Sequence, residues 1–402
     1  MNKRKFLFVL GTRPEVIKVA PVVFAARETG LVETEILHTG QHLELAAEMF
    51  RHFRLRPDFD LAVMQPDQTL FQLTSRITEG IGEIVSRNDY DMIFVQGDTS
   101  SAFIGALCGF YRKIPVGHIE AGLRTLDRYS PFPEEMNRRL VSPLASLHFA
   151  PTQRAGDMLA GEGIPRNHIA VTGNTVIDAL LWSLQQDYPV RDDIKDILDM
   201  PGRLLLVTTH RRENFGEPHR QVFSALLELV ERFNDTRILF PIHPNPNVRR
   251  EAAAMLNNHP RIHLTSPLDY QSFIRAMQKS CLILSDSGGV QEEAPSLNKP
   301  VLVLRESTER PEGLRYRGLQ GVQSVLVLRE STERPEGLDT GALKLVGTDK
   351  TRIIEAASDL LTSEDSYQAM ANAQNPYGDG KASQKIIATA LDYIDRQGKN
   401  HS

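Results

Sequence analysis

The sequence has few cysteines and none of the common signatures of metal or nucleophile sites. Cys108 and Cys281 are its only two cysteines, and both lie in apolar surroundings. We expect buried, reduced thiols and no disulfide, because disulfide-stabilised chains belong to oxidising compartments. The His, Glu and Cys residues show no zinc-type spacing, so no metal is predicted. The sequence also lacks a Ser-His-Asp elbow and a Walker loop, which excludes those two classes of site.

The chain also lacks a strong excess of charge and any long apolar run. Its formal net charge of -5 gives no electrostatic reason to expect a nucleic-acid partner. No run approaches the ~18 apolar residues that a membrane-spanning helix needs. The apolar segment 6–10 is too short for the core of a signal peptide. We therefore expect a cytoplasmic protein that binds neither nucleic acid nor membrane.

Short apolar runs alternate with longer amphipathic segments, which is typical of a parallel α/β sheet. The expected strands are 5–10, 35–37, 92–95, 116–119, 147–150, 169–174, 203–209, 237–241, 262–264, 281–285 and 301–304. The expected helices of the first half are 14–29, 43–53, 69–87 and 100–111. With 402 residues the chain exceeds what one core usually supports. The sequence thus predicts an α/β protein with two Rossmann-like domains facing a cleft.

The strand pattern stops once and restarts, which sets the predicted domain boundaries. We expect an N-terminal Rossmann-like domain at 1–174, a connector at 175–200 and a second Rossmann-like domain at 201–376. Residues 377–402 are expected to form a C-terminal helix that packs back on the N-terminal domain. Ligands of such sheets bind at the carboxyl ends of the strands, so functional residues are expected there.

The segment 117–139 mixes charged residues with turn-forming ones. Its charged residues include Glu120, Arg124, Asp127, Glu134, Glu135 and Arg138, and its turn-formers are Gly122, Pro131 and Pro133. A helix or strand made only for packing would not carry this mixture. Carboxylates on a rigid loop beside arginines suit proton transfer on an anionic substrate. The alternative is a solvated surface loop held by salt bridges.

The first strand leads into a candidate phosphate site. Gly11 permits a tight turn, and Pro14 suits the first position of the following helix. The helix N-terminus, Arg13 and Lys18 could together bind a diphosphate. A junction of this kind alone is a weak signal, because many α/β proteins have one without a ligand.

Strand 281–285 leads into a second junction of the same type. Here the backbone of Ser287, Gly288 and Gly289 can offer N–H groups to a phosphate, and Glu293 could accept ribose hydroxyls. The structural alternative is a helix that Asp286 or Ser287 caps, with Glu292 as the capping-box partner. Both interpretations can hold at once.

Three further polar residues follow predicted strands. Asp98 comes after strand 92–95, where an isolated aspartate is usually a helix N-cap. His210 follows strand 203–209 and precedes two arginines, so it suits a phosphate oxygen or a structural role. His243 is more ambiguous than either.

With these residues the chain resembles the bacterial non-hydrolysing UDP-N-acetylglucosamine 2-epimerases. The resemblance runs in order over nearly the whole chain. Its motifs are GTRPEVIK at 11–18, TGQH at 39–42, QGDT at 96–99, GHIEAGLRT at 117–125, PFPEEMNR at 131–138, TGNTVIDALL at 172–181, THRREN at 209–214, DSGGVQEEAPSL at 286–297, TERPE at 308–312 and NPYGDGKAS at 375–383.

The resemblance implies a glycosyltransferase-B-like fold with UDP held mostly by the second domain. It also implies a homodimer that interconverts UDP-N-acetylglucosamine and UDP-N-acetylmannosamine, without a metal or nicotinamide cofactor, for surface polysaccharides. The reaction removes the C2 proton and expels UDP to leave a 2-acetamidoglucal. Both groups then return with the opposite configuration at C2.

The resemblance also assigns roles to residues. The implied catalytic set is Asp98, Glu120, Glu134 and His210. The implied UDP-binding set is Arg13, Lys18, Phe273, Ser287, Gly288, Gly289, Glu293 and Arg310. Reprotonation from the other face requires a second acid–base group, which accounts for two glutamates, and which glutamate serves which face stays open. The alternatives are a hydrolysing relative that releases UDP and N-acetylmannosamine, a glycosyltransferase and a non-catalytic sugar-nucleotide binder.

The chain departs from the family near a second sugar-nucleotide site that activates some members. Gln41, His42 and Arg211 match that site. Glu44 stands where a glutamine is expected, and Asp67 stands where an arginine is expected. An acid in place of a base repels a phosphate, so we predict weakened or absent activation.

The second departure is a repeat. Residues 301–314, VLVLRESTERPEGL, recur unchanged at 325–338, which is 24 positions later (325 − 301). Segments 315–318 and 339–342 can be encoded by one DNA sequence read one base apart, which suggests a duplication with a one-base slip. Arg310 and Arg334 thus become candidates for the same UDP contact. We favour Arg310, with 315–338 as an insertion, because 301–304 continues the expected strand.

Overall fold

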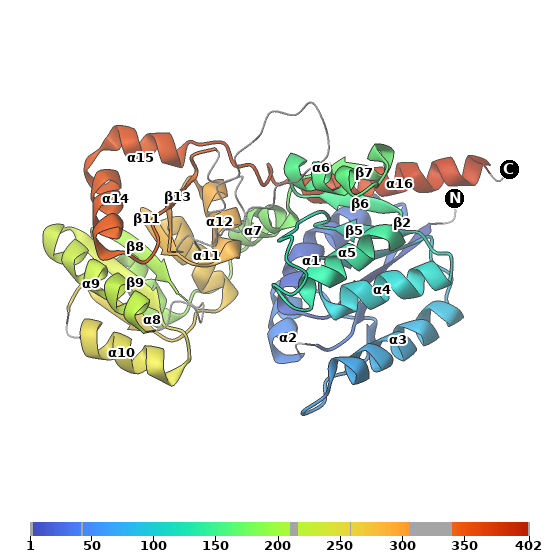
Figure 1. Cartoon of the computed structure of the whole chain (residues 1–402), viewed down its shortest axis with the longest axis horizontal. Coiled ribbons are helices and arrows are strands. Elements are labelled where there is room, and N and C mark those ends of the chain that lie inside the picture. Colours follow the sequence, from blue (N-terminus) through green and yellow to red (C-terminus); the bar gives the residue numbers. More distant parts are fainter. Residues whose placement is uncertain (1–2, 42, 210–215, 258, 305–339, 401–402) are drawn as a thin grey trace. The chain divides into compact units, whose positions relative to one another are not determined.

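The structure is a computed structural model that describes residues 3–41, 43–209, 216–257, 259–304 and 340–400. The chain divides into two compact units. Unit 1 comprises Met1–Asp187 with Pro376–Ser402, and unit 2 comprises Tyr188–Asn375. Each unit contains one parallel sheet with helices between its strands (Figure 1). The predicted α/β class with two Rossmann-like domains is therefore confirmed.

The described strands of unit 1 form a sheet in the order β3-β2-β1-β4-β5-β6-β7. Their bounds are β1 Arg4–Leu10, β2 Val32–His38, β3 Phe59–Asp60, β4 Met92–Gln96, β5 Val116–Ile119, β6 Leu147–Ala150 and β7 Ile169–Val171. All neighbouring strands in this sheet run parallel. The central strands β1 and β4 are buried along almost their whole length, because both faces of a parallel sheet are covered by its crossover helices.

The helices of unit 1 connect and cover these strands. They are α1 Arg13–Glu28, α2 Leu43–His52, α3 Leu70–Arg87, α4 Ser100–Tyr111, α5 Glu134–Leu144, α6 Gln153–Gly161, η1 Arg166–His168, α7 Thr175–Gln185 and α16 Ala382–Asn400. The C-terminal α16 returns to this unit and packs against α1 and α7 (Figure 1, red). Asp178 of α7 accepts hydrogen bonds from the backbone N–H groups of Ala382 and Ser383 and so fixes the start of α16.

Unit 2 repeats the same plan. Its described strands, in the order β10-β9-β8-β11-β12-β13, are β8 Arg203–Thr208, β9 Thr236–Pro241, β10 Ile262–Thr265, β11 Leu282–Ser285, β12 Val301–Val303 and β13 Leu343–Leu345. Its helices are α8 Asp192–Asp199, α9 Glu217–Arg232, α10 Pro246–Leu256, α11 Tyr270–Lys279, α12 Gly288–Glu293, η3 Ala294–Leu297, α14 Lys350–Thr362 and α15 Glu364–Ala371.

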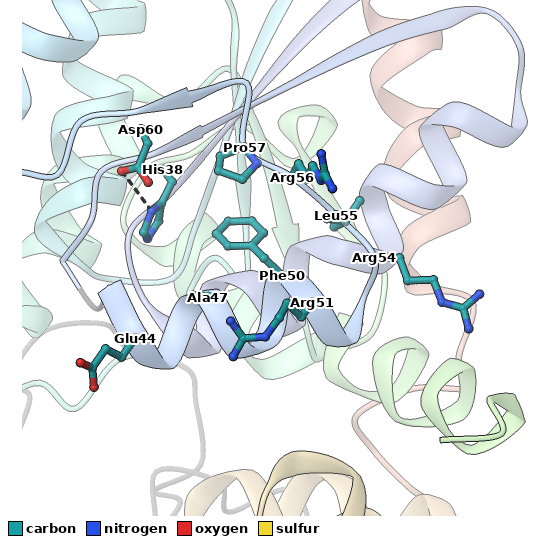
Figure 2. A pocket seen from close by; sticks show the side chains of 10 residues that line it. All are labelled: His38, Glu44, Ala47, Phe50, Arg51, Arg54, Leu55, Arg56, Pro57 and Asp60. Carbon is teal, nitrogen blue, oxygen red and sulfur yellow. Dashed lines mark ion pairs between the residues drawn. The ribbon is translucent and has the colours of Figure 1, made fainter. Parts of the chain in front are cut away.

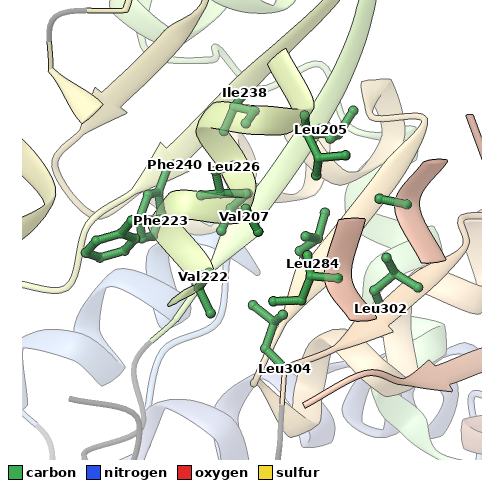
Figure 3. Close-up of a cluster of buried hydrophobic side chains, with 14 of the residues drawn as sticks. Leu205, Val207, Val222, Phe223, Leu226, Ile238, Phe240, Leu284, Leu302 and Leu304 are labelled. Atoms are coloured by element: carbon green, nitrogen blue, oxygen red, sulfur yellow. The ribbon is translucent and has the colours of Figure 1, made fainter. Parts of the chain in front are cut away.

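The core of unit 2 lies between its sheet and the helices α9, α10 and α14. Phe223 of α9 packs on Phe240 of β9, with ring centroids 5.8 Å apart (Figure 3). Leu284, Leu302 and Leu304 extend the same buried cluster across β11 and past the end of β12. The first copy of the repeated segment thus supplies an interior strand of the sheet.

Three details differ from the sequence-based expectations. The strands β3 and β13 were not predicted, since runs of two and three residues carry no readable alternation. The predicted strand 169–174 ends at Val171, and Asn174 instead begins α7. The predicted connector 175–200 is divided between the units, because α7 packs on α1 and α8 packs on α11.

Two sequence-level expectations concern cysteines and membranes. Cys108 is buried and Cys281 is half-buried, and both are free thiols. Burial raises the pKa of each thiol to about 11, so both are protonated at neutral pH. Within the described ranges, no helix combines the length and apolar character required to cross a membrane.

Candidate active site

Glu120 lies where three donors from separate elements of unit 1 meet. It directly follows β5 and has a backbone φ of 63°, which is uncommon for a residue other than glycine. Its Oε1 accepts hydrogen bonds from Lys18 Nζ on α1 and from Asn174 Nδ2 at 3.2 Å. Its Oε2 accepts one from Gln96 Nε2 at the end of β4. The carboxylate is thus held in one orientation within a nearly buried site.

The parallel pairing of β4 with β5 explains this meeting. Gln96 is the register partner of Ile119, so both strands end at the same edge of the sheet. The Gly97 carbonyl lies 2.8 Å from His118 Nε2. Burial lowers the pKa of His118 to about 3, so its imidazole is neutral at physiological pH. The strand ends therefore form a fixed platform beneath Glu120.

Asp98 lies in the turn that follows β4, and its carboxylate faces α5. Arg138 donates to Asp98 Oδ2 through Nη2 at 2.6 Å and through Nε at 2.8 Å. Asn137 Nδ2 donates to the Asp98 backbone carbonyl at 2.9 Å. The N-cap of α4 is Thr99, whose hydroxyl accepts from Ala102 N, so the usual capping role does not explain Asp98. Its carboxylate is 28% exposed and remains accessible to a ligand.

The segment 117–139 contains several ion pairs between its own residues and with the C-cap residue of α6. Glu135 is fully buried and pairs with Arg138 at 3.3 Å and with Arg139 at 3.1 Å. Arg124 pairs with Glu162 at 2.7 Å. These ion pairs shape the loop, as the structural alternative predicts. Glu134, the first residue of α5, is half-buried and has no hydrogen bond or ion pair with a described residue.

The first strand-to-helix junction is organised by a carboxylate that sequence reasoning did not single out. Glu15 Oε2 accepts from the backbone N–H groups of Gly11 at 3.0 Å and Thr12 at 2.6 Å, and its Oε1 accepts from the Thr99 hydroxyl at 2.7 Å. Burial raises the pKa of Glu15 from 4.5 to about 7, and the hydrogen bonds oppose this shift. Glu15 therefore ties the turn at 11–13 to the turn after Asp98.

Two other features of this junction bear on phosphate binding. The helix begins at Arg13, one residue earlier than predicted, and Arg13 Nε is buried without a hydrogen-bond partner in the described part of the chain. Gly11 cannot carry a side chain here, because a Cβ would lie 2.2 Å from Ser101 Oγ and 2.6 Å from Thr39 Oγ1. Lys18, predicted to bind UDP, contacts Glu120 in the structure.

Gln41 connects the predicted second site to α4. Its Oε1 accepts from the backbone N–H and the hydroxyl of Ser101, near the start of α4. Ser101 Oγ in turn lies 2.7 Å from Thr39 Oγ1. Glu44 and Asp67 are both exposed, in the first turn of α2 and just before α3. His42 and Arg211 lie outside the described residues.

In unit 2, the second predicted phosphate junction follows β11. Ser287 occupies the N-cap position of α12, but its side chain makes no capping hydrogen bond, so a capping box with Glu292 is not formed. The Ser287 backbone N–H donates to Ser285 Oγ at 3.0 Å. A Cβ on Gly289 would be 3.7 Å from Glu293 Oε2, an ordinary van der Waals contact. Phe273 is half-buried on α11.

His210, Arg310 and Arg334 lie outside the described residues. Gly288 begins α12 next to Ser287 and Gly289. Among the described residues, no group of three His, Cys, Asp or Glu side chains is arranged to hold a metal ion.

A cavity of about 790 Å³ lies elsewhere in unit 1, between α2 and the end of β2 (Figure 2). It is lined by His38, Glu44, Ala47, Phe50, Arg51, Arg54, Leu55, Arg56, Pro57 and Asp60. Burial lowers the pKa of His38, which pairs with Asp60 at 3.4 Å. Figure 2 shows the guanidinium groups of Arg54 and Arg56 directed away from the space beside Phe50. None of the described residues of the predicted catalytic and UDP-binding sets lines this cavity.

Comparisons with known proteins show which family the chain is similar to. The profile of the family described as UDP-N-acetylglucosamine 2-epimerase matches residues 25–320 and 321–391. The chain belongs to this family. The UDP-N-acetylglucosamine 2-epimerases of Bacillus subtilis and Escherichia coli K12 are each 42% identical to it, over 97% and 95% of this chain and 96% and 97% of the relatives.

Solved structures of the family share the fold. The UDP-GlcNAc 2-epimerase of Neisseria meningitidis, solved bound to UDP-GlcNAc, is similar over 96% of this chain and 100% of its own, with 41% identity and a TM-score of 0.80. The family's solved enzyme from Methanocaldococcus jannaschii, in complex with UDP-GlcNAc and UDP, is 32% identical with a TM-score of 0.73. It covers 97% of this chain and 99% of its own. The glycosyltransferase-B-like expectation is confirmed at the level of the fold.

Several residues of the candidate site were missed by sequence reasoning. They are Gln96, Glu15 and Asn174, which all lie within the motifs that carry the family resemblance. The signal that could have found them is their position at strand ends and helix starts next to Asp98 and Glu120. Their partners, however, are distant in the sequence.

Proposed function

We propose that this protein interconverts UDP-N-acetylglucosamine and UDP-N-acetylmannosamine without hydrolysis, supplying precursors for surface polysaccharides. The observation that carries the proposal is the Glu120 carboxylate, which Lys18, Gln96 and Asn174 hold in one orientation. A fixed carboxylate next to a cation has the geometry for removing a weakly acidic proton from an anionic substrate.

In the proposed reaction, a carboxylate takes the C2 proton, and the C2–H electron pair becomes the C1=C2 double bond. The C1–O bond breaks, and its electrons leave with the UDP phosphate oxygen. UDP then adds back to C1 while C2 receives a proton on the other face. Glu120 and Glu134 are the two acid–base candidates, and Asp98 and His210 complete the catalytic set.

We assign UDP binding to the residues that the family motifs supply. The cationic and polar residues among them can neutralise the charge that develops on the departing diphosphate. The full UDP-binding set is Arg13, Lys18, Phe273, Ser287, Gly288, Gly289, Glu293 and Arg310. The buried, unpaired Nε of Arg13 supports this assignment, since a buried donor without a partner is costly unless a ligand satisfies it.

We further propose a homodimer. Two neighbouring aromatic side chains at the end of α4 support an association surface, because Phe110 and Tyr111 are 57% and 68% exposed. Sedimentation equilibrium at micromolar concentration tests this point, and a monomeric mass would contradict it.

Incubation with UDP-N-acetylglucosamine in deuterated water tests the function. We expect deuterium at C2 of both intact nucleotide sugars, followed by NMR and mass spectrometry. Free UDP with free sugar would identify the hydrolysing reaction instead, and unchanged substrate would identify a binder. Transfer to an added acceptor would identify a glycosyltransferase.

The variant Glu120→Gln should lower the epimerisation rate by roughly 10²–10⁴-fold, the range for loss of a general base. Glu33→Gln is the matched control, because Glu33 is an exposed glutamate on β2. A Glu120→Gln enzyme with the turnover of the parent would contradict the assignment.

A further inference from the structure

The amide of Asn174 has its orientation fixed by two contacts. Its Oδ1 accepts from the Val176 backbone N–H at 3.1 Å, as the N-cap of α7. Its Nδ2 donates to Glu120 Oε1 at 3.2 Å. If the amide flipped, it would lose both hydrogen bonds, because the oxygen would face a carboxylate and the nitrogen would face a backbone donor. The backbone N–H of Asn174 also donates to the Tyr377 carbonyl at 2.6 Å, which anchors this residue to the C-terminal segment.

Gln96, on β4, holds the second oxygen of the Glu120 carboxylate. It is 3% exposed and lies at the end of β4, so the sheet fixes its backbone. Its Nε2 donates to Glu120 Oε2. Each of the two amides thus donates one hydrogen bond to a different oxygen of Glu120, and the Lys18 ammonium donates a further one to Oε1. Asn174 is only 2% exposed, so both amides act in a nearly dry site where each hydrogen bond is strong.

We propose that Gln96 and Asn174 are positioning residues that hold Glu120 as the acid–base group for one face of the sugar, an inference that rests on the proposed function. The left-handed backbone of Glu120 is costly and persists only where the surroundings fix it. Two neutral donors fix the direction of the carboxylate without neutralising its charge, which a second cation would do. Hydrogen bonds to the ionised form also favour the anion, the form that accepts the C2 proton.

Asn174→Asp separates positioning from structure. Aspartate keeps the acceptor that caps α7, since Asp and Asn are equally good N-caps. It replaces the Nδ2 donor by an oxygen facing Glu120 Oε1, and like charges favour protonation of one partner. We expect kcat to fall about 10- to 100-fold with KM little changed, as for a misplaced catalytic group. We also expect the acidic limb of the pH–rate profile to move up by about one unit.

Gln96→Met removes the other donor at similar volume. We expect a fall in kcat of about 10-fold or more, and a matching fall in C2 deuterium exchange measured in deuterated water. For Asn174→Asp, the matched control is Asn88→Asp. Asn88 donates to the Ile84 carbonyl at 3.0 Å and not to Glu120. Thermal unfolding of all variants checks that they are folded.

The outcomes distinguish the two claims. An inactive Glu120→Gln enzyme, together with parental kcat and pH profiles in both Asn174→Asp and Gln96→Met, would overturn the positioning roles alone. A Glu120→Gln enzyme with parental turnover would overturn the role of Glu120 and with it the positioning roles, whereas a parent protein that leaves UDP-N-acetylglucosamine unchanged in deuterated water would overturn the proposed function itself. A fall in kcat with an unchanged pH profile in Asn174→Asp, accompanied by a lower unfolding temperature, would assign Asn174 a structural role and overturn its positioning role.

Discussion

The Arg138 guanidinium binds one oxygen of Asp98, with Nη2 2.6 Å and Nε 2.8 Å from Oδ2. This contact joins α5 to the turn after β4 and links two residues 40 positions apart in the sequence. Arg138 also reaches the buried Glu135 through Nη1 at 3.3 Å. One guanidinium thus sets the position of a proposed catalytic carboxylate relative to the first turn of α5, which carries Glu134.

Arg138→Lys should therefore lower kcat about 10-fold or more, because lysine keeps the charge but cannot make the forked contact. Arg139→Lys is the control, since Arg139 pairs only with Glu135 among the described residues. We expect the control to stay within about twofold of the parent. Equal rates for the two variants in a coupled UDP-sugar assay would refute a specific role for Arg138.

Glu15 should make the stability of the protein depend on pH. Its pKa is about 7 in the folded state and 4.5 as a free side chain, with burial as the main cause. The folded chain therefore keeps a proton that the unfolded chain loses between these values. The stabilisation is fully present below pH 4.5 and is lost as the pH rises towards 7.

Glu15→Gln removes this titration. Between pH 4.5 and 7, the free energy of unfolding of the parent should fall relative to that of the variant by about 3 kcal/mol, at about 1.4 kcal/mol per pKa unit. Urea unfolding at several pH values measures the difference. Parallel curves for parent and variant would show that Glu15 does not titrate in this window. The exposed Glu33→Gln should give no such divergence.

The sequence predicts the strand ends well but not the contacts that form there. The strands 116–119 and 147–150 and the helix 100–111 agree with the structure at both ends, because apolar runs with clear turn signals mark them. The candidates Asp98 and Glu120 follow from the rule that parallel strands present ligands at their carboxyl ends.

The partners of these residues required the structure. Asn174 lies 54 positions from Glu120 and Arg138 lies 40 positions from Asp98, and no local pattern encodes such pairs. The role of Asp98 as an N-cap was a reasonable local expectation, but Thr99 takes it. Lys18 is assigned to UDP by its motif, and that motif did not predict the contact that its amine makes with Glu120. Sequence patterns therefore do not determine which polar side chains pair across the tertiary structure.

Substrate activation should be weak or absent in this protein. Glu44 and Asp67 replace a glutamine and an arginine of the activator site, and both carboxylates are exposed where they would repel a phosphate. We expect a hyperbolic dependence of the initial rate on UDP-N-acetylglucosamine. We also expect conversion of UDP-N-acetylmannosamine to proceed without added activator.

Restoring the family residues with Glu44→Gln and Asp67→Arg should create or strengthen activation. Glu48→Gln on the same helix is the control, because it removes one negative charge from α2 at a position outside the site. Sigmoidal kinetics in the parent protein, measured with a coupled UDP assay, would show that the two substitutions do not abolish activation.

The repeated segment yields a deletion that removes the ambiguity between Arg310 and Arg334. Because 301–314 and 325–338 are identical, removing 315–338 or removing 301–324 gives the same 378-residue chain (402 − 24). This chain keeps one VLVLRESTERPEGL segment and a single arginine at the expected distance from both Ser287 and β13. It therefore has the family spacing on both sides.

The deletion shortens the connection between Val303 and Leu343 from 39 residues (343 − 303 − 1) to 15 (39 − 24). Loop closure scales as (3/2)RT ln n, so the shorter connection should stabilise unit 2 by about 1 kcal/mol. That corresponds to a rise in unfolding temperature of about 2–4 °C. We expect the shortened protein to bind UDP at least as tightly as the parent in calorimetry and to retain turnover.

In the full-length chain, Arg310→Ala should weaken UDP binding by about 10- to 100-fold, as expected for loss of a charged hydrogen-bond donor to phosphate. Arg334→Ala should leave it unchanged. The opposite result would place the second copy in the site, since β12 and its buried neighbours Leu302 and Leu304 could accept either identical strand sequence. Equal, partial effects of both substitutions would mean that segments 301–314 and 325–338 alternate in the same place. The single-copy chain would then bind UDP more tightly than the parent.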